Sequence, residues 1–268
     1  MIALNISDRT LDQLFKSLKE YNPTTNEVME KIAIAMQLFG MVIVLVLFLI
    51  EFQDTSRKFN RDDGGMTTEL FLNIGAKYLV AWACIMMSSQ LVDGILWFFI
   101  QMAKWIHSLL PLGTQEDVIP GMVKASWFQR GLLFLFQMLA YIAIAIASFT
   151  TKILIFLRGI QLYILKALAP VLIAFFVSEE MKQTAIGWLK QVLAYALQGA
   201  LLILIIGLIP IITKNDFLST SLTGDIWEKA GKVVMNIITY FTLILKYGVI
   251  IFLLIGSQNL AKRLIGAM

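Results

Sequence analysis

The chain has 268 residues, of which 59% are hydrophobic and 15% charged, and its formal net charge at pH 7 is +4. Soluble proteins carry roughly 45–50% apolar and about 25% charged residues, so this composition excludes a soluble globular protein and predicts a multi-pass membrane protein. The single cysteine, Cys84, and the single histidine, His107, exclude an internal disulfide and a Cys/His metal cluster, and we expect neither a metal nor a cofactor.

The first segment, residues 1–31, is predicted to lie outside the membrane or at its surface. Within residues 10–21, Leu11, Leu14, Phe15 and Leu18 follow the i, i+3, i+4, i+7 spacing of a helix. This spacing predicts an interfacial amphipathic helix, capped by Thr10. Residues 32–268 are predicted to form a transmembrane helical domain with a larger loop at residues 104–127.

Six apolar stretches follow in this domain, and each is long enough to cross a bilayer. Residues 128–177 carry only four charges, and one helix of that length would measure about 75 Å, so two passes with a turn at Arg158 and Gly159 are predicted. The fold class is therefore all-α, a polytopic transmembrane helical bundle of about six segments (five to seven) with an N-terminal amphipathic helix. The predicted spans are residues 32–50, 78–103, 132–152, 161–177, 188–212 and 233–255.

Polar side chains recur every three or four residues along the second span, so they lie on one helical face. They either join helices through hydrogen bonds or line a hydrated passage, and both interpretations stay open because ionised groups facing lipid are costly. These channel-lining or helix-packing candidates are Gln90, Asp93, Trp97 and Gln101, followed by Lys104.

Several cations also lie within the apolar stretches. Lys152 and Arg158 are expected to extend from span ends to the headgroups, and Lys166 is expected near an interface. Lys246 lies near the middle of the last span and joins the functional candidates. Its predicted partner is Asp93.

A proline-containing stretch followed by a polar turn and a second apolar stretch forms the most informative segment. Pro170 should kink its helix, because proline removes a backbone hydrogen bond, and Trp188 is expected at the headgroup level. The predicted structural hairpin motif comprises Lys166, Pro170, Gly187, Trp188, Gln191 and Tyr195.

This hairpin, with ALAP at 167–170 and GWLKQ at 187–191, resembles the TrbL-type polytopic inner-membrane subunits of type IV secretion and conjugation systems. The resemblance implies a subunit that assembles into a homo-oligomeric ring. The partners of this ring would be lipids and the other membrane subunits and ATPases of the secretion machine. Translocated DNA or protein would be a transient partner. Pro170, Trp188 and Tyr195 match the family's proline, tryptophan and aromatic positions.

Motifs for phosphate binding, zinc hydrolysis or nucleophilic catalysis are missing from the sequence, and we expect no enzymatic activity. The prediction is a membrane-embedded channel or scaffold subunit of a conjugative type IV secretion system. The alternative is a small-molecule transporter or ion channel subunit, in which Asp93 and Lys246 would couple transport. Such a transporter would be expected to show paired broken helices.

Overall fold

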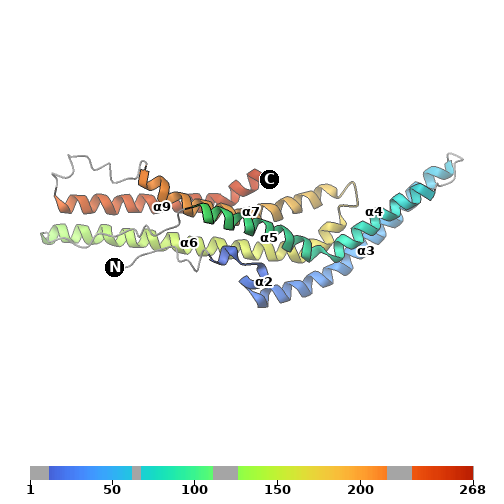
Figure 1. The fold of residues 1–268 in the computed structure, drawn as a ribbon, viewed down its shortest axis with the longest axis horizontal. Helices are drawn as coiled ribbons and strands as arrows, with labels where there is room; N and C mark the ends of the chain where they lie inside the picture. Colours follow the sequence, from blue (N-terminus) through green and yellow to red (C-terminus); the bar gives the residue numbers. More distant parts are fainter. Residues whose placement is uncertain (1–11, 62–67, 111–125, 216–230, 268) are drawn as a thin grey trace. The chain divides into compact units, whose positions relative to one another are not determined.

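The computed structural model describes residues 12–61, 68–110, 126–215 and 231–267. These residues form seven α-helices and one short 3₁₀-helix, without a β-strand, which confirms the all-α fold class. In chain order the elements are η1 (Gln13–Phe15), α2 (Leu18–Tyr21), α3 (Pro23–Arg61), α4 (Thr68–Met86), α5 (Ser88–Leu109), α6 (Trp127–Ala174), α7 (Lys182–Asn215) and α9 (Lys232–Ile265), and Figure 1 labels them.

Four helices are long and apolar enough to cross a membrane: α3, α6, α7 and α9. The bent pair α4 and α5 makes a fifth candidate if it counts as one span, at the lower end of the expected range. The chain is therefore a multi-pass membrane protein. The predicted loop at 104–127 lies mostly outside the described residues, and its first residues, up to Leu109, extend α5.

The predicted turn at Arg158 and Gly159 was wrong. Helix α6 runs without interruption for 48 residues, which corresponds to about 72 Å at 1.5 Å per residue. Arg158 is buried, because its guanidinium packs on Gly199, where an added Cβ would lie only 2.5 Å from the Arg158 Cζ. The missing side chain of Gly199 in α7 thus leaves room for the Arg158 guanidinium.

The predicted second span is broken rather than continuous. Helices α4 and α5 meet at Met87 with a bend of 68°. The break leaves backbone carbonyls at the end of α4 without intrahelical partners. Gln37 of α3 donates through its side-chain amide to the carbonyls of Ile85 and Met86, at 3.4 and 3.1 Å, and so satisfies both.

The N-terminal helical segment is present in two short pieces, η1 and α2. A capping box at α2 is formed by Ser17 and Glu20, whose side chains each accept a hydrogen bond from the other's backbone amide. The predicted cap at Thr10 lies outside the described residues. Asn22 caps the start of α3, since its side-chain oxygen accepts a hydrogen bond from the Thr25 amide at 3.0 Å.

The chain divides into two compact units. The first comprises Met1–Phe15, Ile100–Arg158 and Gln198–Ala261. Its buried positions on α9 follow a strict three-and-four spacing, and the ring of His107 packs edge to face on Phe15 at 5.1 Å. The buried α9 side chains are Tyr240, Leu243, Tyr247, Ile250, Leu254, Ser257 and Ala261.

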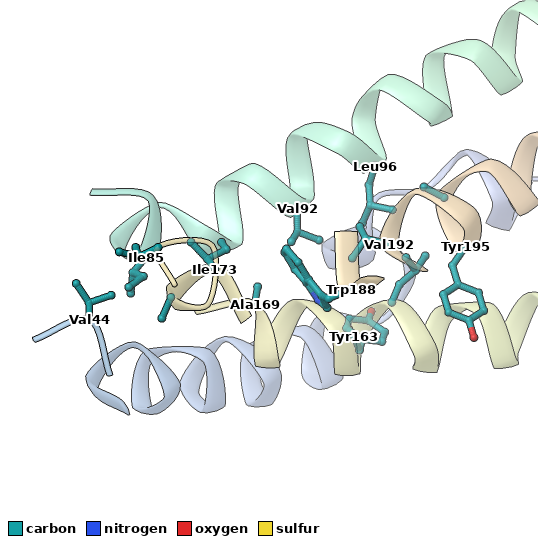
Figure 2. Packing of buried hydrophobic residues seen from close by; sticks show 14 of the residues in the cluster. Val44, Ile85, Val92, Leu96, Tyr163, Ala169, Ile173, Trp188, Val192 and Tyr195 are labelled. Atoms are coloured by element: carbon teal, nitrogen blue, oxygen red, sulfur yellow. The ribbon is translucent and has the colours of Figure 1, made fainter. Parts of the chain in front are cut away.

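The second unit comprises Lys16–Phe99, Gly159–Leu197 and Lys262–Met268. Within it α3 and α4 run side by side and antiparallel, with Glu51 accepting hydrogen bonds from Lys77 and Tyr78 (Figure 1). Figure 2 shows the apolar cluster of this unit, in which Trp188 of α7 lies among side chains from α5 and α6. Trp188 is therefore buried against neighbouring helices, and its expected position at the headgroup level stays a prediction.

Candidate functional site: a buried lysine between three helices

The candidate site centres on Lys166 of α6, whose side chain is only 2% exposed. Its ammonium nitrogen lies 2.8 Å from the Asp93 Oδ2 of α5, 3.5 Å from the Glu30 Oε1 and 3.4 Å from the Asn26 Oδ1, both of α3. The ammonium donates hydrogen bonds to Asp93 and Asn26, and Glu30 adds a second carboxylate at ion-pair distance. The geometry explains how a full charge is tolerated inside an apolar cluster.

Asn26 organises the α3 side of this site. Its amide nitrogen donates to Glu30 Oε1 at 2.8 Å while its oxygen accepts from Lys166, so the three side chains form a closed triangle. Asn26 is 3% exposed, whereas the carboxylates of Asp93 and Glu30 are 49% and 47% exposed. The site therefore has a buried cation and two carboxylates that open to its surroundings, with one net negative charge.

The local reason for this arrangement is a four-residue stripe on α6. Gly159, Tyr163, Lys166 and Pro170 are spaced by four, three and four, so they share one helical face. Each contacts the N-terminal part of the same unit. The Tyr163 hydroxyl donates to backbone carbonyls of Leu18 and Asn22, and it thereby fixes the segment that leads into α3.

The two ends of this stripe depend on glycine. A Cβ on Gly159 would meet the Tyr21 ring at 3.1 Å, and a Cβ on Gly40 of α3 would lie 2.7 Å from the Pro170 carbonyl oxygen. Backbone therefore touches backbone where α3 crosses α6, which only glycine permits. This close approach brings the α3 side chains within reach of Lys166.

The structure pairs Asp93 with Lys166, a buried cation that the sequence analysis did not connect with it. The predicted pairing of Asp93 with Lys246 stays a prediction. Lys246 has its ammonium 6.0 Å from the ring centroid of Tyr247. Among the residues that the structure describes, no three His, Cys, Asp or Glu side chains gather as metal ligands.

The other polar residues of α5 are placed as follows. Gln90, Trp97 and Lys104 are exposed, as is Asp93, and Gln101 is half-buried. The opposite face of α5 is buried and apolar, formed by Val92, Leu96, Ile100 and Ala103. A polar stripe beginning at Gln90 and Asp93 thus lies on the open side of the helix, and its role as a channel lining stays a prediction.

The hairpin motif forms as a helix–turn–helix. Trp188 donates from its ring nitrogen to the Leu165 carbonyl at 3.2 Å, which ties α7 to α6 one residue before Lys166. Tyr195 is buried, Gly187 has open space beside its Cα, and Gln191 is exposed. Pro170 lies inside α6, four residues before its end.

Sequence reasoning missed the α3 side of the site. Asn26 and Glu30 were read as part of an extramembrane segment, although their spacing of four places them on one face of the same helix. The spacing of Gly159, Tyr163 and Lys166 could have predicted that Lys166 is buried. A lysine on the same helical face as a tyrosine and a glycine indicates a face that packs on another helix rather than on lipid.

Comparison with known proteins agrees with the hairpin resemblance. A model of the TrbL/VirB6 plasmid conjugal transfer protein family matches residues 63–257, which is well over half of the chain. The chain belongs to the TrbL/VirB6 plasmid conjugal transfer family. No curated protein and no solved structure matches it.

The family match covers part of the candidate site only. Asp93 and Lys166 lie inside the matched residues of this TrbL/VirB6 chain, whereas Asn26 and Glu30 precede them. The membership identifies the chain as a membrane component of a conjugal transfer system.

Proposed function

We propose that this TrbL/VirB6 chain is a channel or scaffold subunit of a conjugative type IV secretion system, which supports DNA or protein translocation as a homo-oligomer. The family match gives the system, and the observation that supports an assembled state is the exposed polar stripe of α5. An ionised group at the centre of a bilayer costs about 2.5–3.5 kcal/mol. Asp93 and its neighbours therefore call for water or protein, rather than acyl chains, on their open side.

The buried lysine has a positioning role in this proposal. Lys166 joins α3, α5 and α6 within one unit and holds the Asp93 carboxylate at the start of the stripe. The half-exposed Asp93 and Glu30 keep free acceptor capacity, since each carboxylate offers about four lone-pair sites. Donors from water in a passage, or from a neighbouring subunit, can use that capacity.

Disulfide cross-linking in native membranes tests the assembly. Trp97 and Phe98 of α5 are nearly equally exposed, at 63% and 59%, but they lie about 100° apart around the helix. In a Cys84→Ala background, Trp97→Cys should form covalent dimers on mild oxidation, whereas Phe98→Cys, which lies off the polar stripe, should form far fewer. Equal cross-linking at both positions, or none at either, contradicts an interface or passage on the polar stripe.

A mating assay tests the system. Deleting the gene from its conjugative element should abolish transfer, and the wild-type chain supplied in trans should restore it. Transfer that continues without the chain would contradict the proposal.

The alternative is a small-molecule transporter or ion channel subunit, and the broken pair α4 and α5 is the observation in its favour. Transporters of that kind pair two broken helices across an internal repeat. The described residues contain one such bent pair. Solute flux by the purified chain in liposomes, together with unimpaired mating by the deletion strain, would favour the alternative.

A further inference from the structure

Three basic side chains gather at the end of α9 in the second unit. Lys262 and Arg263 lie in the last turn of that helix, and Lys190 of α7 approaches the same end, with its ammonium nitrogen 3.8 Å from the position of a Cβ on Gly266. Lys190 and Lys262 are half-buried and Arg263 is exposed. We call these three side chains the basic cluster.

The helix end that carries the basic cluster is well defined. Gly266 adopts a left-handed φ of 66°, and the amides of Gly266 and Ala267 bond to the carbonyls of Arg263 and Lys262 at 3.2 and 2.9 Å. This pattern is a Schellman motif, which ends the helix sharply and fixes its last turn. The backbone positions of Lys262 and Arg263 are therefore fixed by the helix end.

The helix end cannot balance the charge of the cluster. The carbonyl end of a helix is equivalent to roughly −0.5 elementary charge, whereas the cluster carries three positive charges. Within the described part of the chain, none of the three side chains forms an ion pair. An excess of about two positive charges remains for an external anion.

An aromatic ring closes one side of the cluster. The Lys262 ammonium lies 5.5 Å from the centroid of the Tyr195 ring, within the range of a cation–π contact. Tyr195 is buried on α7, so the contact holds Lys262 against the helix pair. The buried Tyr195 ring therefore borders the basic cluster on the side of Lys262.

The position of the cluster along the two helices indicates the source of the anion. Residues 191–213 of α7 carry no charge, and neither do residues 247–261 of α9. Lys190 precedes the first uncharged stretch and Lys262 follows the second. Because α7 and α9 are membrane-spanning helices, the ends of their uncharged stretches correspond to the level of the lipid headgroups.

We propose that Lys190, Lys262 and Arg263 bind the phosphate headgroup of an anionic phospholipid, with the Tyr195 ring beside it. Basic pockets between transmembrane helices are suited to such headgroups because two or three cations can surround one phosphate. The inference is independent of channel function, since it concerns the lipid that the chain holds and not what it translocates.

Native mass spectrometry of the purified full chain with added lipid tests the proposal. Wild-type protein should retain phosphatidylglycerol in preference to phosphatidylcholine. The variant Lys190→Gln, Lys262→Gln, Arg263→Gln should bind phosphatidylglycerol roughly a hundredfold more weakly, from about fivefold for each charge removed near a membrane surface. The charge-retaining variant Lys190→Arg, Lys262→Arg, Arg263→Lys should keep the preference.

The matched control removes two lysines and one arginine elsewhere, at the exposed positions Lys16, Lys19 and Arg130, each changed to Gln. It should bind the lipid like the wild type. Unchanged binding by the cluster variant, or an equal loss in the control, overturns the proposal. If the triple variant does not fold, Arg263→Gln alone removes an exposed charge and should show the fivefold loss, and its absence overturns the proposal equally.

Soluble phosphates distinguish the sources of the anion. Inorganic phosphate and a single-stranded oligonucleotide should fail to displace phosphatidylglycerol from the wild-type chain. If either competes as well as soluble-chain phosphatidylglycerol and the competition requires the basic cluster, the site recognises phosphate without a membrane and the lipid assignment is overturned.

Discussion

Neutralising both carboxylates around Lys166 should destabilise the protein far more than neutralising either one. The double variant Glu30→Gln, Asp93→Asn leaves an ammonium that is 2% exposed without an opposite charge. An uncompensated charge in a buried pair costs about 3–5 kcal/mol. The two amide oxygens can still accept hydrogen bonds, so we expect a loss in the free energy of unfolding toward the lower end of that range.

The single variants should cost less because each leaves one carboxylate in place. Asp93→Asn keeps Glu30 at 3.5 Å from the ammonium, and Glu30→Gln keeps Asp93 at 2.8 Å. Each replaces a charged hydrogen-bond acceptor by a neutral one, a difference of about 1 kcal/mol. The sum of the two singles should therefore fall short of the double, as expected for side chains that share a partner.

Removing the cation as well should restore most of the lost stability. Lys166→Met added to the double variant replaces the buried charge by an apolar side chain of similar length, and such replacements are often neutral or stabilising. We expect this triple variant to unfold within about 1 kcal/mol of the wild type. Lys152→Met, at an exposed lysine of the same helix, is the control for losing a lysine and should change stability by less than about 0.5 kcal/mol.

Reversible unfolding in mixed detergent micelles, followed by circular dichroism, measures these differences. We expect the triple variant to be more stable than the double variant, although it carries more substitutions. A triple variant as unstable as the double would show that the lost stability comes from packing and not from the unpaired charge.

Gly40→Ala should lower the free energy of unfolding by about 1–3 kcal/mol, because its Cβ would lie 2.7 Å from the Pro170 carbonyl oxygen. The control is Gly75→Ala, whose Cβ meets nothing within 4 Å. It should be neutral or stabilising in the same unfolding assay. Gln37→Leu should lower the free energy of unfolding by about 1–3 kcal/mol, since the carbonyls of Ile85 and Met86 lose their donor. It should also raise amide hydrogen exchange at the α4–α5 break. Unchanged exchange there would show that Gln37 does not stabilise the break. Trp188→Phe should lower the free energy of unfolding by about 1 kcal/mol, because it loses the hydrogen bond to α6. Trp188→Ala should lower it by about 3–5 kcal/mol, because it also leaves a cavity. Equal losses in the two variants would contradict these two contributions.

Much of the architecture follows from composition and periodicity. The apolar stretches predicted at residues 32–50, 188–212 and 233–255 lie inside α3, α7 and α9, and the hairpin between α6 and α7 occurs where proline and the polar turn indicated it. These features depend on local properties, namely the length of an apolar run and the polarity between two runs. They are therefore readable without knowledge of any neighbour.

The features that sequence reasoning missed depend on residues far away in the chain. Arg158 was predicted at a turn, because its neighbours in the sequence do not reveal that its guanidinium packs on Gly199. The break at Met87 has neither proline nor glycine to announce it, and its carbonyls are satisfied by Gln37, about fifty residues earlier. Lys166 meets Asn26 and Asp93 across separations of 140 and 73 residues.

The buried charge also has a physical logic in a membrane. Apolar side chains gain little by preferring another helix to lipid acyl chains, so apolar packing alone discriminates weakly between registers. A buried lysine that contacts three polar side chains of two other helices favours one register, and a glycine–proline backbone contact one turn away along α6 restricts it further. If the assembled subunit displays the polar stripe of α5 toward its neighbours, the register of that stripe is set by Asp93, because its carboxylate is the point at which α5 is held by Lys166.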